Sequence, residues 1–150
     1  MAENREEGRE SRQLFCRVIT PEEVVFDDEV DMVVARIADG DLGVLVDHAS
    51  LVSTVEPGAV RISQGDERHV YATSDGFFKV SENLVQVLVQ EAVPASEIDV
   101  SEAESRVEEA ERDLSAISDD EGAERARADV ERRRRMGETL VHVARRYGEG

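Results

Sequence analysis

Residues 84–117 read LVQVLVQEAVPASEIDVSEAESRVEEAERDLSAI, and the spacing of their apolar residues changes at Pro94. Before Pro94, apolar and polar residues alternate as on a half-buried strand, with Val85, Val87 and Val89 as apolar members. After Pro94, apolar residues recur every three or four positions, as on one face of a helix, at Val100, Ala103, Val107, Ala110, Leu114 and Ile117. The pattern therefore predicts a strand-rich part over residues 13–93 and a helical part over residues 94–150.

Residues 13–93 have the composition of short antiparallel strands. They are rich in valine, whose β-branched side chain fits a pleated sheet better than a helix. Turn-forming residues interrupt the segment at roughly ten-residue intervals, at Pro21, Asp39-Gly40-Asp41, Pro57-Gly58, Gly65-Asp66, Asp75-Gly76 and Ser81-Glu82-Asn83. Because no helical pattern lies between these turns, we expect a small antiparallel β-sandwich or flattened barrel. The aromatic residues available for its core are Phe15, Phe26, Phe77, Phe78 and Tyr71.

Residues 94–150 predict an antiparallel hairpin of two helices. Residues 118–122 break the first helical pattern, and a second follows with small or apolar residues at Ala123, Ala126, Val130, Gly137, Leu140, Ala144 and Tyr147. Two helices joined by so short a link pack antiparallel. Asp99 or Ser101 can cap the start of the first helix.

The contact between these two helices is expected to be weak. The second helix offers mostly Ala and Gly, which bury little apolar surface, and Arg133 falls on the seam between Val130 and Gly137. The stem of Arg133 can lie across the seam with its guanidinium in water. Alternatively, or in addition, the hairpin need not stay closed for its function.

The charge of the chain disfavours one class of partner. Lys and Arg number 18 against 35 Asp and Glu, a formal net charge of -17, so nucleic-acid binding would require a segregated basic face. No apolar run is long enough for a membrane span and no secretory signal is present, so we expect a soluble, cytosolic protein. Residues 1–12 are polar and lack periodicity, and we expect them to form a disordered tail.

Motifs for catalysis and for a cofactor are lacking in the sequence. One cysteine, Cys16, and three scattered histidines do not have the spacing of a zinc site, and no phosphate-binding loop or nucleophile elbow occurs. We expect Cys16 to be a buried strand thiol and His48 to be a structural hydrogen-bonding residue rather than a catalyst. Carboxylates at residues 27–31 could bind a cation, but strand alternation would divide them between two faces. The sequence therefore predicts no metal, no cofactor and no enzymatic activity.

Several stretches together carry a resemblance to a known family. They are Gly40-Asp-Leu-Gly43-Val-Leu-Val-Asp-His48-Ala49, Val55-Glu-Pro57-Gly58, Ser74-Asp-Gly76-Phe77, and Asn83 to Ala92 followed by Ile98-Asp99. In order and in spacing, from Gln13 to about Tyr147, this series resembles the epsilon subunit of bacterial F-type ATP synthase. The family's prolines fall here at Val46 and Ser50, where this chain departs from the pattern. The resemblance implies a sandwich of ten strands followed by two helices.

The resemblance also implies a non-catalytic rotor subunit. In the family the sandwich lies at the foot of the gamma subunit and against the c-ring, and it couples proton-driven rotation of the ring to the catalytic head. The loop from Gly40 to His48 would face the ring, with Asp41, Leu42 and His48 as contacts to the c-ring or gamma; the alternative for these residues is a simple solvated turn. The complex would lie on the cytoplasmic face of the plasma membrane, with this subunit peripheral and not inserted.

A regulatory role for the hairpin is implied by the same resemblance. In the family the hairpin lies folded on the sandwich, or it extends along gamma into the alpha/beta head and inhibits ATP hydrolysis. The basic run Arg132, Arg133, Arg134 and Arg135 would then contact the catalytic beta subunits. Alternatively, these arginines pair with acids of the hairpin itself, such as Asp129, Glu131, Glu108 and Glu109.

The sequence disfavours nucleotide binding by the hairpin in this chain. Some family members bind ATP through Ile/Leu-Asp-x-x-Arg-Ala, and the same stretch here reads Ile98-Asp99-Val100-Ser101-Glu102-Ala103. Glu102 stands in place of the arginine, and a carboxylate repels nucleotide phosphates. Two alternatives to the rotor subunit remain: a nucleotide-sensing binding module, and an acidic β-sandwich adaptor that captures a partner helix.

Overall fold

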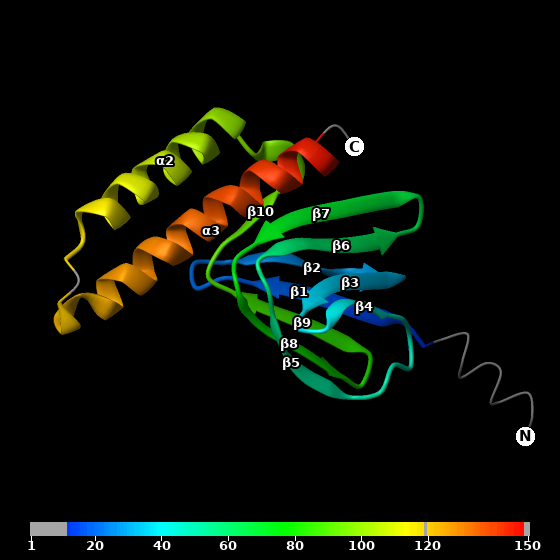
Figure 1. Cartoon of the computed structure of the whole chain (residues 1–150). Helices are drawn as coiled ribbons and strands as arrows, with labels where there is room; N and C mark the ends of the chain where they lie inside the picture. The colour runs from blue at the N-terminus through cyan, green and yellow to red at the C-terminus, as the bar shows by residue number, and fades with distance from the viewer. Residues whose placement is uncertain (1–11, 119, 149–150) are drawn as a thin grey trace, which may run out of the picture. The chain divides into compact units, whose positions relative to one another are not determined.

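The strands of the computed structural model form two facing sheets, and the structure describes residues 12–118 and 120–148 (Figure 1). Within these residues the strands are β1 (Leu14–Ile19), β2 (Val24–Val30), β3 (Met32–Ile37), β4 (Gly40–Val44), β5 (Leu51–Val55), β6 (Gly58–Gln64), β7 (Glu67–Thr73), β8 (Gly76–Ser81), β9 (Leu84–Val89) and β10 (Ala92–Pro94). Each sheet has five strands, in the orders β2-β1-β9-β8-β5 and β10-β7-β6-β3-β4. The predicted sandwich is confirmed.

Two helices follow the strands and lie side by side as an antiparallel hairpin (Figure 1). A 3-10 turn, η1 (Ala95–Glu97), leads into α2 (Val100–Ala116), and a second, η2 (Glu121–Ala123), precedes α3 (Glu124–Tyr147). The predicted hairpin is therefore also confirmed. The chain divides into two compact units, one ending at Ala92 and the other beginning at Val93, and each is described by itself below. The predicted disordered tail falls on residues 1–12, of which only Arg12 lies within the described residues.

The core of the sandwich consists of the inward-facing residues of both sheets. Its largest fully buried side chains are Phe78, Leu14, Ile62, Val18, Val33, Val44, Val55, Val60, Val80, Val85 and Val87. Tyr71 is buried and Phe26 packs against the cluster from its edge, as predicted. Phe15 and Phe77 were expected in the core as well, and that prediction is wrong, because they are 45% and 59% exposed. The alternation of a strand explains this: with Leu14 and Phe78 facing inward, their neighbours must face outward.

Strand β1 has an unusual neighbour for a sandwich built mainly from antiparallel pairs. On one side it pairs antiparallel with β2, and on the other it runs parallel to β9, from Phe15 opposite Leu84 to Ile19 opposite Leu88. The first strand of the sandwich therefore lies between the second strand and the ninth. Residues of β1 and β2 therefore share one outer surface with residues of β8 and β9, which come much later in the sequence.

The seam of the hairpin is built from close approach rather than from large side chains. Ala103 and Ala110 of α2 are buried, and so are Val130, Gly137, Leu140 and Ala144 of α3, all at the predicted positions. A Cβ atom added to Gly137 would lie 2.7 Å from Cγ2 of Val107 and 3.3 Å from the carbonyl oxygen of Ala103. The small residues thus allow the two backbones to come together. Met136 and Val143 are buried too, although they lie outside the predicted stripe.

Ion pairs connect the two helices across the seam. Arg133 donates to Asp113 at 3.1 Å, and Arg145 donates to Glu104 at 2.8 Å. Arg133 therefore does reach across the seam, but its guanidinium ends on a carboxylate of the other helix. Both partners of that pair are about half exposed, at 47% and 49%, so solvent screens it.

Candidate functional site

The connection between β4 and β5 forms an exposed apolar tip at one end of the sandwich. Residues 40–44, expected to begin a loop, belong to strand β4, and the turn lies at Val46 and Asp47. Leu45 and Val46 are 56% and 42% exposed, although both are large apolar residues. We call residues 45–48 the tip loop. Exposed apolar side chains at a loop are typical of a surface that a partner covers.

The three predicted contact residues near this loop are not brought together. Asp41 faces outward on β4 and lies 3.5 Å from the guanidinium of Arg61. Leu42, one residue later, faces the other way and packs against the core. His48 follows the strand in the tip loop, and its Nδ1 lies 2.7 Å from the carbonyl oxygen of Ala49. Asp41 is thus exposed at the surface, whereas Leu42 and His48 are both half-buried.

The tip loop is tied to the turn between β8 and β9. The backbone N–H of Asp47 donates to Oδ1 of Asn83 at 2.6 Å, and Nδ2 of Asn83 donates back to Oδ1 of Asp47 at 3.3 Å. Arg12 adds an ion pair to the other carboxylate oxygen of Asp47 at 3.1 Å. No local sequence pattern predicts this link, because the two residues are 36 positions apart.

The outer face of the β2-β1-β9-β8-β5 sheet carries a second apolar surface. Phe77 pairs with Leu88, Leu88 with Ile19, and Ile19 with Val24, so these four side chains form a row across four neighbouring strands. Three of them are strongly exposed: Phe77 at 59%, Leu88 at 40% and Val24 at 52%. We call this row the apolar row. Phe15 and Val52, also exposed, lie on strands β1 and β5 of the same sheet.

The four consecutive arginines of α3 point in several directions and have different partners. Arg132 lies 3.3 Å from Asp129, one turn earlier, and Arg134 lies 3.9 Å from Glu138, one turn later. Arg133 pairs with Asp113 of α2. Arg135 is exposed and has no ion pair with the described residues. In the closed hairpin the arginines therefore do not form one surface.

The residues that match the family's nucleotide motif have structural tasks here. Asp99 caps α2, since its Oδ1 accepts a hydrogen bond from the backbone N–H of Glu102 at 3.2 Å. Ala103 is buried in the seam, whereas Ile98 is half-buried just before the helix and Glu102 is exposed. None of the four side chains provides a positive charge for a phosphate.

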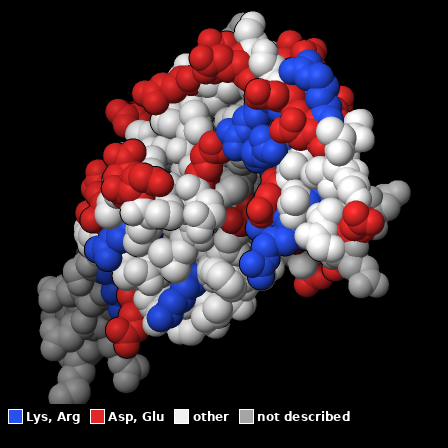
Figure 2. Space-filling view, turned by 90° about the vertical axis from the view of Figure 1, so that its left-hand side faces the viewer, with Lys and Arg blue, Asp and Glu red and all other residues white. Residues whose placement is uncertain are grey.

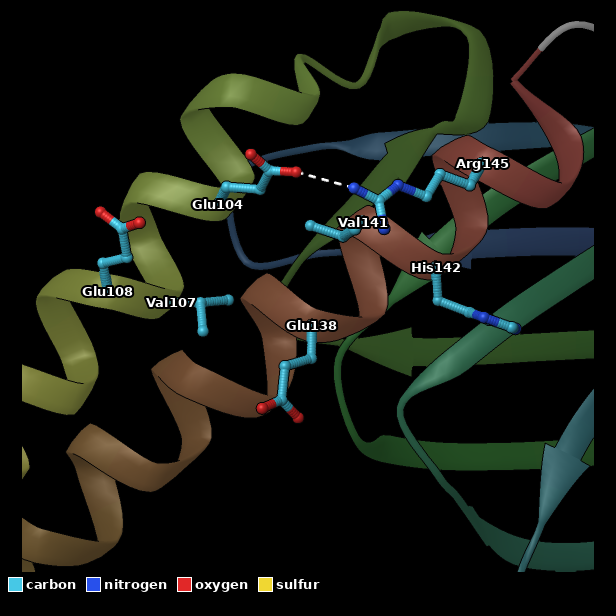
Figure 3. A pocket seen from close by; sticks show the side chains of 7 residues that line it. All are labelled: Glu104, Val107, Glu108, Glu138, Val141, His142 and Arg145. Atoms are coloured by element: carbon cyan, nitrogen blue, oxygen red, sulfur yellow. Dashed lines mark hydrogen bonds and ion pairs between the residues drawn. The ribbon is translucent and has the colours of Figure 1, made fainter.

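A groove of about 460 Å³ lies between α2 and α3 (Figure 3). Its lining comprises Glu104, Val107, Glu108, Glu138, Val141, His142 and Arg145. Arg145 and Glu104 point toward one another across it, so the guanidinium is already paired with a carboxylate, while His142 points away from that pair (Figure 3). Three carboxylates on the lining make the groove unfavourable for an anion such as a nucleotide.

Burial and local contacts account for the surroundings of the remaining candidate residues. Cys16 is buried as expected, and burial raises the pKa of its thiol to about 12. The pKa of Asp28 is lowered, mainly because its carboxylate accepts the backbone N–H of Glu29. Arg17 lies 3.4 Å from Asp27. Among residues 12–118 and 120–148, no group of three or more His, Cys, Asp and Glu side chains is placed to hold a metal ion.

Charged side chains of both signs are interspersed on the surface. Figure 2 shows acidic side chains in excess on the face in view, with basic side chains in small groups among them. No helix in the described part of the chain is long and apolar enough to cross a membrane.

Comparisons with known proteins agree on one family. Residues 13–95 match the family described as ATP synthase, Delta/Epsilon chain, beta-sandwich domain. An ATP synthase epsilon chain from Rubrobacter xylanophilus is 64% identical over 143 residues, which cover 94% of this chain and 98% of that protein. A sodium-ion-specific ATP synthase epsilon chain from Propionigenium modestum is 34% identical over 69% of this chain and 75% of its own length. A chain in the Euglena gracilis mitochondrial ATP synthase, solved as OSCP/F1/c-ring, superposes with a TM-score of 0.69 at 27% identity, covering 86% of this chain and 79% of that one.

Proposed function

The chain belongs to the epsilon chains of ATP synthase, and we propose that it links the gamma subunit to the c-ring in the central stalk of a proton-translocating F-type enzyme. It performs no catalysis itself. It acts as a peripheral rotor subunit on the cytoplasmic face of the plasma membrane and contacts the membrane sector only through the ring.

The observation that carries this proposal is the apolar row on the outer face of the β2-β1-β9-β8-β5 sheet. Phe77 and Leu88 are 59% and 40% exposed and lie directly opposite each other. Exposed apolar patches of this kind mark interfaces, because burying them against a partner is favourable. We assign this face to gamma, and the tip loop, with Leu45, Val46 and His48, to the c-ring. A two-partner arrangement is supported by the Euglena assembly, which includes both F1 and the c-ring.

The experiment tests the two surfaces against the two partners. A fully buried Phe or Leu side chain contributes about 1.5–3 kcal/mol, and about half of each of these side chains remains to be buried by a partner. Phe77→Ser with Leu88→Ser should therefore weaken gamma binding by about ten- to a hundred-fold. The matched variant, Leu45→Ser with Val46→Ser, changes two equally exposed apolar residues. It should bind gamma normally and bind the c-ring less tightly. Pull-down with purified gamma and with detergent-solubilised c-ring measures both affinities, and equal effects of both variants on gamma would contradict the assignment.

We further propose that the hairpin regulates ATP hydrolysis by opening and extending into the alpha/beta head. The closed hairpin depends on a seam of small residues and on two half-exposed interhelix ion pairs. Exposed pairs contribute only about 0.2–1 kcal/mol each. A closed state stabilised this weakly can exchange with an extended one whose contacts lie on partner subunits. In that extended state Arg132, Arg133, Arg134 and Arg135 would contact the beta subunits.

The test of this regulatory role must separate hairpin opening from contact with the head. Replacing all four arginines by Ala also breaks the Arg133–Asp113 pair and so favours opening. The triple variant Arg132→Ala, Arg134→Ala and Arg135→Ala keeps that pair and should relieve inhibition of ATP hydrolysis in the assembled complex. Asp113→Ala, which breaks the pair but keeps every arginine, should strengthen inhibition. Unchanged inhibition in the triple variant would refute the proposed contact.

Neither alternative function is favoured by the site. A nucleotide-sensing module would need a cation free to meet phosphates, and Arg145 in the interhelix groove is already bound to Glu104. The adaptor alternative would leave the apolar row and the tip loop without defined partners.

A further inference from the structure

One residue of the tip loop has a left-handed backbone conformation. Asp47 has φ 64, in the left-handed region, which Asp adopts more readily than most residues with a Cβ. The backbone N–H of His48 donates to the carbonyl oxygen of Leu45 at 3.2 Å, which closes the turn. This hydrogen bond closes the turn at one point, and contacts from outside the loop hold Asp47 as well.

The holding contacts come from the turn between β8 and β9. Asn83 accepts the N–H of Asp47 at 2.6 Å and donates to the Asp47 carboxylate at 3.3 Å. Asn83 is itself fixed, because it lies in a turn with φ 64 next to Glu82 at φ 49, and its carbonyl oxygen accepts the N–H of Phe15 at 2.8 Å. The Asn83 side chain therefore connects a rigid hairpin turn to the tip loop, which carries the exposed Leu45 and Val46.

We propose that Asn83 is a positioning residue for the c-ring contact: it holds the tip loop, through Asp47, in the shape that presents Leu45, Val46 and His48. This inference rests on the proposed function, since the c-ring is the partner that the tip loop meets there. Arg12 supports the same arrangement with its ion pair to Asp47. Asn83 itself need not touch the ring.

The turn offers an unusually clean variant and a matched control. Asn83→Gly removes the side chain, but glycine accepts the positive φ of that position without strain, so the hairpin turn is kept. Glu82→Gly makes the same change one residue earlier, at a position that also has positive φ and has no hydrogen bond to the tip loop within the described part of the chain.

The first measurement is made on the full chain alone. Asn83→Gly should raise the rate at which the Asp47 backbone amide exchanges its hydrogen with solvent by about ten-fold, as expected for the loss of the hydrogen bonds to Asn83. The midpoint of thermal unfolding should stay close to that of the unchanged protein. Glu82→Gly should leave that exchange rate unchanged. Equal exchange rates for Asp47 in Asn83→Gly and in the unchanged protein would overturn the proposal.

The second measurement is binding to detergent-solubilised c-ring. Asn83→Gly should weaken it by about ten-fold and leave gamma binding intact, whereas Glu82→Gly should bind both partners normally. The double variant Asp47→Asn with Asn83→Asp swaps the two side chains, so an amide again faces a carboxylate, and it should recover most of the affinity for the ring. Asn83→Asp alone places two carboxylates together and should not recover that affinity. Faster Asp47 exchange with unchanged ring binding would overturn the positioning role and leave the proposed function standing. Failure of the unchanged protein to bind the ring would refute the proposed function itself, and the inference with it.

Discussion

Replacing Gly137 by alanine should destabilise the hairpin, although alanine is the better helix former. In a helix interior Ala is favoured over Gly by about 1 kcal/mol. Against this, the added Cβ would lie 2.7 Å from Cγ2 of Val107 and 3.3 Å from both the Ala103 carbonyl oxygen and the Val107 backbone nitrogen. Valine is stiff at χ1 in a helix, and the two backbone atoms cannot move without separating the helices. Overpacking of this kind costs about 1–3 kcal/mol.

The two effects leave a net loss of about 1 kcal/mol for Gly137→Ala. For a unit of this size, that loss lowers the midpoint of thermal unfolding by about 4–8 °C. Circular dichroism at 222 nm follows the loss of helix on heating. The matched control is Gly122→Ala, because an added Cβ at Gly122 meets nothing within 4 Å.

A second substitution tests the cause of the effect. In a background of Val107→Ala, which removes the Cγ2 atom, Gly137→Ala should cost much less than in the unchanged chain. The difference between the two costs is the interaction energy of a double-mutant cycle. If Gly137→Ala melts at the same temperature as the unchanged protein or higher, the helices do not approach as closely as the structure indicates.

Three further predictions follow from the fold and the site. ATP at millimolar concentration should leave the melting temperature of the isolated protein unchanged, since one-site binding at 100 times the dissociation constant would add about 2.7 kcal/mol; a clear upward shift would contradict the assignment of Glu102 as the residue that disables the nucleotide motif. A chain ending near Ala95 should still unfold cooperatively and bind gamma, and a disordered spectrum would contradict an independently folding sandwich. Because the pKa of Cys16 is raised from 9.0 to about 12, folding favours the protonated thiol, so its contribution to stability is complete below pH 9 and is lost as the pH rises from 9 toward 12. Chemical denaturation at pH 8 and pH 10.5 should therefore show a smaller drop in stability for Cys16→Ala than for the unchanged chain, and equal drops would argue against a buried thiol.

The periodic elements of this fold could be predicted from the sequence because each depends on a local pattern. The change of period at Pro94 marks the end of the strands, and the hairpin seam contains the residues that a helical repeat selects, from Ala103 to Ala144. Period two also shows that Phe77 and Phe78 face opposite ways, but not which one faces inward. That choice is made by packing against the other sheet, which no local pattern contains.

The surfaces that we propose as partner contacts were harder to predict for the same reason. The apolar row joins Val24 to Leu88 and Phe77 through the register of four strands, so it exists only once the sheet has formed. The family resemblance predicts contacts to the c-ring or gamma near the tip loop, at Asp41, Leu42 and His48. It did not indicate Asn83 as the residue that holds the loop, because a turn signal and a matching stretch that begins at Asn83 do not place its side chain beside Asp47.

The parallel pairing of β1 with β9 has a consequence for how the chain is made. During synthesis β1 emerges first, yet it has only β2 as a neighbour until Leu84–Val89 has left the ribosome. Until then one edge of β1 carries unpaired N–H and C=O groups that can recruit another nascent chain. The hairpin has no such delay, since its helices are neighbours in sequence and local contacts form quickly. Completion of β9 therefore sets the moment at which the sandwich can close, and chains that stall before it are the ones most exposed to aggregation.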